Sequence, residues 1–340
     1  MQAGLPRFRS NQARLWLYTK FVNDLGKMTD LGPRHREQLF SGFDFYPGTT
    51  VREQHSSDGT FKILLQWKRP TWPEPALTEC VVIPDGDRYT ACLSSQVGCP
   101  VGCKFCASGL LGLKGNLEAG EIVYQLFALN QMLLPKNVHV TNIVFMGMGE
   151  PMANYANVMK AVRIIHDRKA FDIGARRITI STVGVPARIR DLANEALPLN
   201  LALSLHAPNE PLRRELIPWA SHFALEDILD ACRFYFDQTG REITLEYILL
   251  HDVNDRPEHA RELAKICRTI RANVNLIRYN EVESLPFLRP EADAVLKFQA
   301  ILRDAGVNTH VRKSRGRDID AACGQLRRKA QQELTQLGKA

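Results

Sequence analysis

Three cysteines fall within eight residues of this chain, at a spacing that could hold an iron–sulfur cluster. Cys99, Cys103 and Cys106 form a C-x3-C-x2-C pattern, and cysteine thiolates are the usual ligands of such clusters. Gly98 and Gly102 interrupt regular structure here, which favours a loop that can wrap around a cluster. Three thiolates leave one iron of a four-iron cluster without a protein ligand. That iron is then free to bind a small molecule through an amine and a carboxylate.

A zinc site and a chance grouping are weaker alternatives for these cysteines than the cluster. A structural zinc ion takes four protein ligands, but the sequence contains no second paired-cysteine motif. Three unrelated buried cysteines are a weaker alternative than zinc. Of the remaining cysteines, Cys232 and Cys267 fall on helical patterns, and with Cys80 they are expected to be structural residues.

The composition is that of an ordinary globular protein, with 340 residues, 45% hydrophobic and 24% charged. This length suits one large domain, or a core with a small accessory domain. The net charge of +7 favours a polyanionic partner. Residues 1–10 contain no apolar stretch typical of a signal peptide, and no run reaches the roughly 18 apolar residues of a membrane span. We therefore expect a cytoplasmic protein without membrane contact, whose reduced cysteines bind metal or catalyse.

Strands and helices alternate along most of the sequence. Residues 1 to about 45 have a helical spacing of apolar residues, and residues 48–90 read as extended, with strands at 61–67 and 79–84. A strand at 90–95 then leads into the cysteine loop. The strands expected after it are 142–146, 177–181, 199–204, 243–250, 274–279 and 309–312. The helices expected between them are 119–133, 155–166, 186–196, 225–238, 257–271 and 290–305.

This alternation predicts an α/β fold in which crossover helices join parallel strands, a partial (β/α) barrel with a small N-terminal helical accessory domain. Active sites of barrels lie at the carboxyl ends of the strands. Each polar or glycine residue at a strand end could equally serve as a turn or cap residue. Five such endings on one face indicate a ligand site: the cysteine loop, Gly147–Pro151, Ser181, Ser204–His206 and Asn280.

Three further stretches give the sequence a family resemblance. They are Cys-Leu-Ser-Ser-Gln at 92–96, Met-Gly-Met-Gly-Glu-Pro at 146–151, and Asp-Ile-Asp-Ala-Ala-Cys-Gly-Gln at 318–325. Together with the cysteine loop they resemble the RlmN/Cfr family of radical S-adenosylmethionine RNA adenosine methyltransferases, from about residue 5 to 326. The resemblance implies a barrel of the radical S-adenosylmethionine type. It also implies a [4Fe-4S] cluster, and S-adenosylmethionine as methyl donor and radical source.

The resemblance also implies a role for each matching residue. Cys99, Cys103 and Cys106 would hold the cluster. Cys323 would carry the methyl group, Cys92 would resolve the covalent intermediate, and Glu79 would accept a proton. The residues expected to bind S-adenosylmethionine are Gly149, Glu150, Ser181, Ser204, Leu205, His206 and Asn280, with the carboxylate of Glu150 paired to the ammonium of the cofactor.

The implied reaction has two stages, because adenine C2 and C8 are not nucleophilic whereas a thiolate is. Cys323 first takes a methyl group from one S-adenosylmethionine. A radical made from a second molecule then removes a hydrogen from this methyl group, and the methylene radical adds to adenine. Glu79 accepts the ring proton. Cys92 finally attacks the thioether sulfur, which leaves a transient Cys92–Cys323 disulfide and frees the methylated base.

Without the resemblance, several of these residues would have plainer roles. Cys92 and Cys323 would be buried small residues, and Glu79 a surface carboxylate on an edge strand. The basic run at 312–317 would be a solvated face, but it leads into Cys323 and is expected to contact RNA phosphates. The N-terminal helices would be a small cap, whereas the family places an RNA-binding domain there.

We expect four parts: a helical RNA-binding accessory domain (1–47), a small β extension (48–90), the barrel (91–326) and a basic tail (327–340). The expected product is an adenosine of 23S rRNA methylated at C2, with tRNA as a further substrate. C8 methylation is the alternative, because residues 275–280 look closer to the Cfr branch and Glu281 replaces a usual proline. A non-catalytic RNA-binding protein with a structural metal, or a radical enzyme acting on another substrate class, are further alternatives. We expect a monomer that takes electrons from a donor such as flavodoxin.

Overall fold

The structure is a computed structural model that describes residues 7–22, 24–42, 47–69 and 76–326. The basic tail expected at 327–340 lies outside the described residues. None of the described helices is long and apolar enough to cross a membrane.

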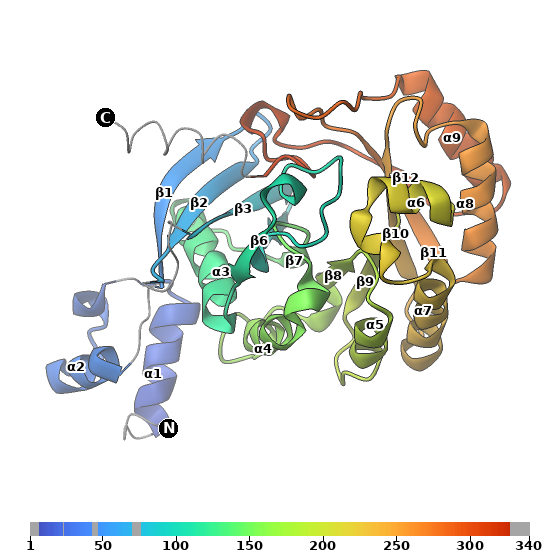
Figure 1. The fold of residues 1–340 in the computed structure, drawn as a ribbon. Helices are drawn as coiled ribbons and strands as arrows, with labels where there is room; N and C mark the ends of the chain where they lie inside the picture. The colour runs from blue at the N-terminus through green and yellow to red at the C-terminus, as the bar shows by residue number, and fades with distance from the viewer. Residues whose placement is uncertain (1–6, 23, 43–46, 70–75, 327–340) are drawn as a thin grey trace.

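The N-terminal residues are helical, as predicted, and form a small unit beside the rest of the fold (Figure 1). The helices α1 (Arg7–Tyr18) and α2 (Pro33–Gly42) flank a 3₁₀ segment and share a small apolar core that includes Leu17, Met28 and Leu31. This unit contacts the body through Tyr18, whose ring lies 5.1 Å from that of Phe171. The apolar core within the unit explains why the helical spacing could be recognised in the sequence.

A ten-stranded sheet organises the remaining described residues, in the order β1-β2-β3-β4-β7-β8-β9-β10-β11-β12. The first strands, β1 (Gly48–His55), β2 (Phe61–Trp67) and β3 (Ala76–Asp85), are antiparallel. From β4 onward all neighbours run parallel. These strands are β4 (Arg88–Cys92), β7 (Asn142–Phe145), β8 (Ile178–Thr182), β9 (Asn200–Ser204), β10 (Ile243–Leu249), β11 (Ala272–Arg278) and β12 (Thr309–Arg312).

Helices cover the outer face of this curved sheet, as crossover connections between parallel strands require (Figure 1). They are α3 (Ala119–Leu133), α4 (Tyr155–His166), α5 (Pro186–Ala193), α7 (Leu225–Thr239), α8 (Pro257–Thr269) and α9 (Ala292–Asp304). The short helix α6 (Glu210–Leu216) lies instead beside the cysteine loop, where its Leu216 carbonyl accepts the Lys104 N–H at 3.0 Å. Short 3₁₀ segments lie at Leu25–Lys27, Gly109–Leu111, Leu134–Lys136, Pro151–Asn154, Ala175–Arg177, Pro218–Ser221 and Arg317–Ile319. The predicted partial (β/α) barrel is confirmed, since β1 and β12 are the two edges of an open sheet.

Three features depart from the sequence predictions. The strand β1 and the helix α6 were not predicted, and neither was the two-stranded ribbon of β5 (Gln96–Gly98) and β6 (Leu113–Asn116), which flanks the cysteine loop. The expected boundary at residue 90 falls inside β4. Because β3 pairs with β4, the residues of the expected β extension continue the main sheet.

The segment after β12 returns across the molecule to the opposite edge of the sheet (Figure 1). We call residues 313–326 the carrier segment, because it contains Cys323. Its Asp318 accepts a 2.6 Å hydrogen bond from the Ser56 hydroxyl in the turn between β1 and β2. Residues more than 250 positions apart in the chain thereby meet above the carboxyl ends of the parallel strands.

Candidate active site

Two adjoining cavities lie at the carboxyl ends of the parallel strands. The first has a volume of about 150 Å³ and is lined by the cysteine loop and the ends of β7, β8 and β9. The second has a volume of about 120 Å³ and is lined by Cys92, Asn280 and much of the carrier segment. Arg312 and Cys323 line both cavities. The two cavities are therefore parts of one site.

Glycines shape the loop that bears the three cysteines. Gly98 has φ of +77°, and a Cβ placed on it would lie 1.8 Å from the Gly112 carbonyl oxygen. That carbonyl accepts a 3.0 Å hydrogen bond from the backbone N–H of Cys99. Within the loop, the N–H of Cys106 donates to the carbonyl of Cys103 at 3.1 Å. The backbone is thus coiled tightly, and all three cysteines line the first cavity.

The three thiols have the chemistry that a cluster requires. Burial, with a smaller contribution from the charge of the neighbouring Cys106, raises the pKa of Cys99 to about 12. Burial also raises the pKa of Cys103, followed by the charges of Cys106 and Cys99. The three sulfurs are therefore near one another and take the thiolate form only when a strongly cationic centre compensates their charge.

The grouping of the thiols fits a cluster better than a single zinc ion. Among the described residues, no three His, Cys, Asp or Glu side chains converge closely enough to hold one metal ion. A four-iron cluster instead takes each thiolate on a different iron, so its ligands stand further apart. Three thiols around one cavity, with Phe105 buried beside them, match that requirement.

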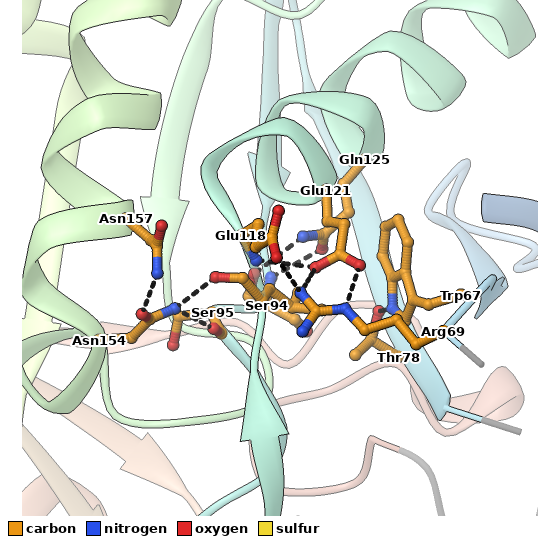
Figure 2. Close-up of polar contacts among 11 residues, drawn as sticks. Trp67, Arg69, Thr78, Ser94, Ser95, Glu118, Glu121, Gln125, Asn154 and Asn157 are labelled. Carbon is orange, nitrogen blue, oxygen red and sulfur yellow. Dashed lines mark hydrogen bonds and ion pairs between the residues drawn. The ribbon is translucent and has the colours of Figure 1, made fainter. Parts of the chain in front are cut away.

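A network of buried side chains holds the stretch that enters the cysteine loop (Figure 2). Gln125 on α3 binds both backbone groups of Ser94, at 2.9 Å and 2.8 Å. The Asn154 amide donates to the carbonyls of Ser95 and Leu117, at 2.8 Å and 2.7 Å. These bonds satisfy buried backbone groups that lie outside a regular ladder. They also explain the Cys-Leu-Ser-Ser-Gln motif as a support for the loop.

The stretch after β7 approaches the cofactor side of the site as predicted. Gly149 and Glu150 line the first cavity. The Glu150 carboxylate accepts hydrogen bonds from the N–H groups of Met152 and Val183, both at 2.9 Å. Burial raises the pKa of Glu150 to about 6, although these two bonds oppose the shift. A hydrogen bond from the Thr182 side chain opposes the shift as well. A carboxylate has about four lone-pair sites, so Glu150 could still accept a bond from a cofactor ammonium.

Replacing Gly149 with alanine is expected to destabilise the protein. Gly149 has φ of +103°, and a Cβ there would lie 2.7 Å from the Ser95 hydroxyl and 2.8 Å from the Gln96 nitrogen. Overpacking of this kind costs about 1–3 kcal/mol of unfolding free energy, which urea denaturation measures. The control is Gly120→Ala on α3, where a Cβ meets nothing within 4 Å. That change should be neutral or stabilising by up to about 1 kcal/mol, and equal losses in both variants would contradict the prediction.

Ser181, Ser204 and His206 also line the first cavity. The two serine hydroxyls are 3.2 Å apart, at the ends of β8 and β9. Nδ1 of His206 accepts the Ile248 N–H at 3.1 Å, which leaves the ring proton on Nε2. Burial lowers the pKa of His206 to about 3, helped by the charge of Arg213. The ring is therefore a neutral hydrogen-bond donor at any working pH.

Two predicted cofactor ligands are placed differently from the rest. The side chain of Leu205 is fully buried in the main apolar core, so only its backbone can face a ligand. Asn280 lines the second cavity, where its amide donates to the Cys323 carbonyl at 3.4 Å and its oxygen accepts from Arg289 at 3.2 Å. The structure thus brings Asn280 to the carrier segment rather than to the serines.

Cys92 and Cys323 come together although 231 positions separate them in the sequence. Both line the second cavity, and Cys323 is the most accessible of the eight cysteines. Burial, followed by the charge of Cys323, raises the pKa of Cys92 to about 12. Burial also raises the pKa of Cys323, whereas the guanidinium of Arg312 lowers it. Arg312 is therefore the cation that favours a thiolate at both positions.

Glu79 is buried on an inner strand, so its alternative description as a surface carboxylate on an edge strand is wrong. Its Oε1 lies 2.9 Å from Nζ of Lys62, which is equally buried. The reasoning from sequence missed this lysine. The available signal was a charged residue at the second position of the otherwise largely apolar strand 61–67.

Glu246 on β10 is a second residue that the sequence pattern did not reveal. Its Oε1 accepts from the Asn275 amide at 2.9 Å and lies 3.4 Å from the guanidinium of Arg312. Burial raises the pKa of Glu246, and Arg312 opposes the shift. Arg312 is thus paired with Glu246 at the site, although 37% of its side chain is exposed.

Comparisons with known proteins agree with this geometry. The family model "Radical SAM superfamily" matches residues 93–264, and "Ribosomal RNA large subunit methyltransferase N-terminal domain" matches residues 1–43. The "Probable dual-specificity RNA methyltransferase RlmN" of Rhodopirellula baltica is 44% identical over 96% of this chain and 86% of that protein. The protein of the same name from Bacillus cytotoxicus is 42% identical over 98% of this chain and 91% of that one.

A solved structure extends the likeness to three dimensions. The crystal structure of a radical SAM methyltransferase from Sphaerobacter thermophilus superposes with a TM-score of 0.92 at 43% identity. It covers 96% of this chain and 94% of that one. The chain therefore belongs to the RlmN family of radical S-adenosylmethionine methyltransferases.

Proposed function

We propose that this protein methylates C2 of an adenosine in 23S rRNA, and also acts on tRNA, by passing the methyl group through Cys323. One observation carries the proposal: Cys323 lines both cavities, between the three cluster cysteines and the space that contains Cys92. A group attached to its sulfur can face the cofactor in one cavity and a base in the other. The name of the relatives, dual-specificity RNA methyltransferases, supports two kinds of RNA substrate.

Cys99, Cys103 and Cys106 would hold a [4Fe-4S] cluster, which when bound would supply the electron that makes a radical from S-adenosylmethionine. The first cavity binds S-adenosylmethionine, with Gly149, Glu150, Ser181, Ser204, His206 and the backbone of Leu205 as its expected contacts, and Asn280 reaching from the second cavity. The remaining chemistry belongs to side chains of the chain itself.

Those side chains divide the reaction among them. The Cys323 thiolate, favoured by Arg312, attacks the donor methyl group and forms a carbon–sulfur bond. After the methylene radical has added to the base, Glu79 takes the ring proton, and the unpaired electron of the adduct leaves to a one-electron acceptor, for which a bound cluster would serve. The Cys92 thiolate then attacks the Cys323 sulfur, so that a sulfur–sulfur bond replaces the carbon–sulfur bond and the carbon takes up a proton. Burial raises the pKa of Cys92 and so favours its thiol form, and Arg312 opposes this shift.

The choice of C2 over C8 follows the RlmN name of the relatives. The loop that contains Glu281, which suggested C8 methylation as the alternative, is held by two hydrogen bonds. Glu281 accepts the backbone N–H of Arg289 at 3.1 Å, and its carbonyl accepts from Gln325 of the carrier segment at 3.2 Å. The residue that departs from the family pattern therefore ties the loop to the site.

The proposal also covers the roles of the parts of the chain, its oligomeric state and its electron donor. Residues 1–47 bind RNA as an accessory domain, which the match to an rRNA methyltransferase N-terminal domain supports. Residues 48–90 extend the sheet, 91–326 form the barrel, and the basic tail at 327–340 adds affinity for RNA. The protein works as a cytoplasmic monomer and takes electrons from a donor such as flavodoxin. A non-catalytic RNA-binding protein would have no use for Cys92 and Cys323 at one cavity.

Nucleoside mass spectrometry tests the proposed function. Unmodified 23S rRNA and tRNA would be incubated with the reconstituted protein, S-adenosylmethionine and a reductant, then digested. 2-Methyladenosine is the expected product. 8-Methyladenosine would overturn the choice of ring position, and no methylated adenosine would overturn the proposed function.

The RNA contact of the carrier segment gives a further prediction. Lys313 and Arg315 flank the second cavity, and Lys313 is exposed. The double variant Lys313→Ala/Arg315→Ala should bind RNA more weakly. The slope of log K against log salt should fall by roughly 0.7–0.9 per lost phosphate contact. Filter binding across a salt series measures it.

A matched variant controls for the loss of net charge. Lys265 and Arg268 are exposed on α8, outside both cavities. Replacing both with alanine removes the same charge and should leave the salt slope unchanged. Equal slopes in the two double variants would show that residues 313–315 are only a solvated face.

A further inference from the structure

A buried lysine lies on a strand next to the site. Lys62 belongs to β2, and only 5% of its side chain is exposed. Its neighbours Phe61, Ile63 and Leu64 are apolar and buried as well. A buried ammonium is unfavourable unless a negative charge and hydrogen-bond acceptors surround it. The partners of Lys62 therefore indicate why a lysine is needed at this position.

Two parts of the reaction centre meet at the Lys62 ammonium. Its Nζ lies 2.9 Å from Oε1 of Glu79 and donates a 3.1 Å hydrogen bond to the Asp320 carbonyl. Glu79 is the proposed proton acceptor, and Asp320 lies three residues before Cys323. One ammonium thus contacts both the proton acceptor and the carrier segment.

The strand register shows that this meeting is built into the sheet. Leu64 of β2 pairs with Glu79 of β3, so Lys62, two residues before Leu64, lies on the same face as Glu79. Val81 shares that face and packs with Cys92 and with apolar residues of the carrier segment. A shift of either strand by one residue would turn Lys62 or Glu79 into the apolar core on the other face.

The turn between β1 and β2 holds the carrier segment at a second point. The Asp58 carboxylate accepts the Gly316 N–H at 3.0 Å. In the opposite direction, the Asp318 carboxylate accepts from the Ser56 hydroxyl at 2.6 Å and from the Ser57 N–H at 3.1 Å. The segment is therefore fixed upstream of the Lys62 contact, and Lys62 binds it again at Asp320, three residues before Cys323.

We propose that Lys62 is a positioning residue of the methyl transfer, holding the Glu79 carboxylate and the Asp320 carbonyl on one ammonium. This assignment rests on the proposed function. Glu79 can accept a proton only as a carboxylate, and a buried carboxylate without a neighbouring cation is driven toward its protonated form. When the ring C–H bond breaks, the proton passes to Glu79 and the bonding electron pair stays with the ring. The unpaired electron of the radical adduct must then pass to a one-electron acceptor, a role that a bound iron–sulfur cluster would fill. Lys62 keeps its own proton and loses its counter-ion, which favours release of the proton from Glu79.

Three variants test the assignment. Lys62→Met removes the charge and keeps the side-chain length, whereas Lys62→Arg keeps the charge. Lys68→Met is the matched control, because Lys68 is exposed just beyond the end of the same strand. If Lys62→Met does not fold, Lys62→Gln carries the same comparison, since its amide can still donate to Asp320 without a positive charge.

The two stages of the reaction are read separately. Methylation of Cys323 in the absence of RNA does not involve Glu79, so it should persist in Lys62→Met. Mass spectrometry of the intact protein measures it. Turnover of RNA should fall by roughly 10²-fold, the range for loss of a proton-transfer group, while KM for RNA stays within about twofold. Lys62→Arg should recover most of this loss, and Lys68→Met should match the wild type.

Three results would overturn the assignment. The first is normal RNA turnover in Lys62→Met, and the second is a folded Lys62→Met variant that loses Cys323 methylation and RNA turnover equally. The third is a Lys62→Arg variant whose RNA turnover is no higher than that of Lys62→Met. Methylation of RNA by the wild-type protein tests the proposed function. The ratio of variant activity to wild-type activity tests the role of Lys62. The two claims therefore fail separately.

Hydrogen–deuterium exchange of the cluster-free protein gives a readout independent of activity. Lys62→Met and Asp58→Ala should each speed exchange in the carrier segment and leave the helices of the barrel unchanged. Lys68→Met should leave the segment as slow as in the wild type. Unchanged exchange in both Lys62→Met and Asp58→Ala would show that these contacts do not hold the segment.

Discussion

Cys92→Ala is expected to leave the protein covalently attached to RNA, whereas Cys323→Ala is expected to be inactive and free of RNA. Cys323 is the sulfur that bonds to the base, so its loss removes the first covalent step. Cys92 acts only after the adduct exists, because it attacks the Cys323 sulfur to release the product. Both cysteines line the second cavity, so one sulfur can reach the other.

A denaturing gel of protein expressed in cells, with and without ribonuclease, measures this asymmetry. Cys92→Ala should show a nuclease-sensitive shift that disappears in the double variant Cys92→Ala/Cys323→Ala. Cys267→Ala, on α8 outside both cavities, should run and react as the wild type does. Free protein from a cluster-loaded Cys92→Ala variant, or RNA methylation by Cys323→Ala, would show that the two roles are wrongly assigned.

The second large effect concerns the cluster itself. Cys99→Ala, Cys103→Ala and Cys106→Ala should each lose most bound iron and all methylation activity, because each removes one of only three thiolate ligands. Each of these side chains lines the first cavity. Iron and sulfide analysis after anaerobic reconstitution measures the loss.

Cys323→Ala is the informative control for the cluster variants, because it removes a cavity thiol that is not a proposed ligand. It should keep its full iron and sulfide while losing activity. A ligand variant that retains full iron and sulfide would remove that cysteine from the ligand set. Loss of iron in Cys323→Ala would instead make Cys323 a ligand.

The barrel could be predicted from sequence because its strands and helices carry regular apolar patterns. Phe61–Trp67, Ala119–Leu133, Tyr155–His166 and Thr309–Arg312 agree with the predicted bounds. In contrast, β1 is mostly exposed, so no apolar alternation marks it. The helix α6 is a single short stretch of seven residues, too brief for a periodic signal.

The site was predictable where several functional residues fall in one short motif. The cysteine loop and the Gly149–Glu150 stretch are such motifs, and the structure brings both to the first cavity. The contacts of Lys62 and Arg312 were not predictable, because each depends on the pairing of distant strands or on the return path of the carrier segment. Position in a motif likewise gave no indication that the Leu205 side chain would point into the core.

The isotopic composition of the transferred methyl group tests the central claim, passage through Cys323, most directly. The protein would be supplied with S-adenosylmethionine carrying a trideuterated methyl group in ordinary water. The RNA product would be digested, and the mass of the methyladenosine would be measured by mass spectrometry. One deuterium leaves while the group is attached to Cys323, and a solvent proton replaces it when the carbon–sulfur bond breaks. Methyladenosine with two deuterium atoms is the predicted product. Methyladenosine that retains all three would mean direct transfer to the base, and would contradict the account.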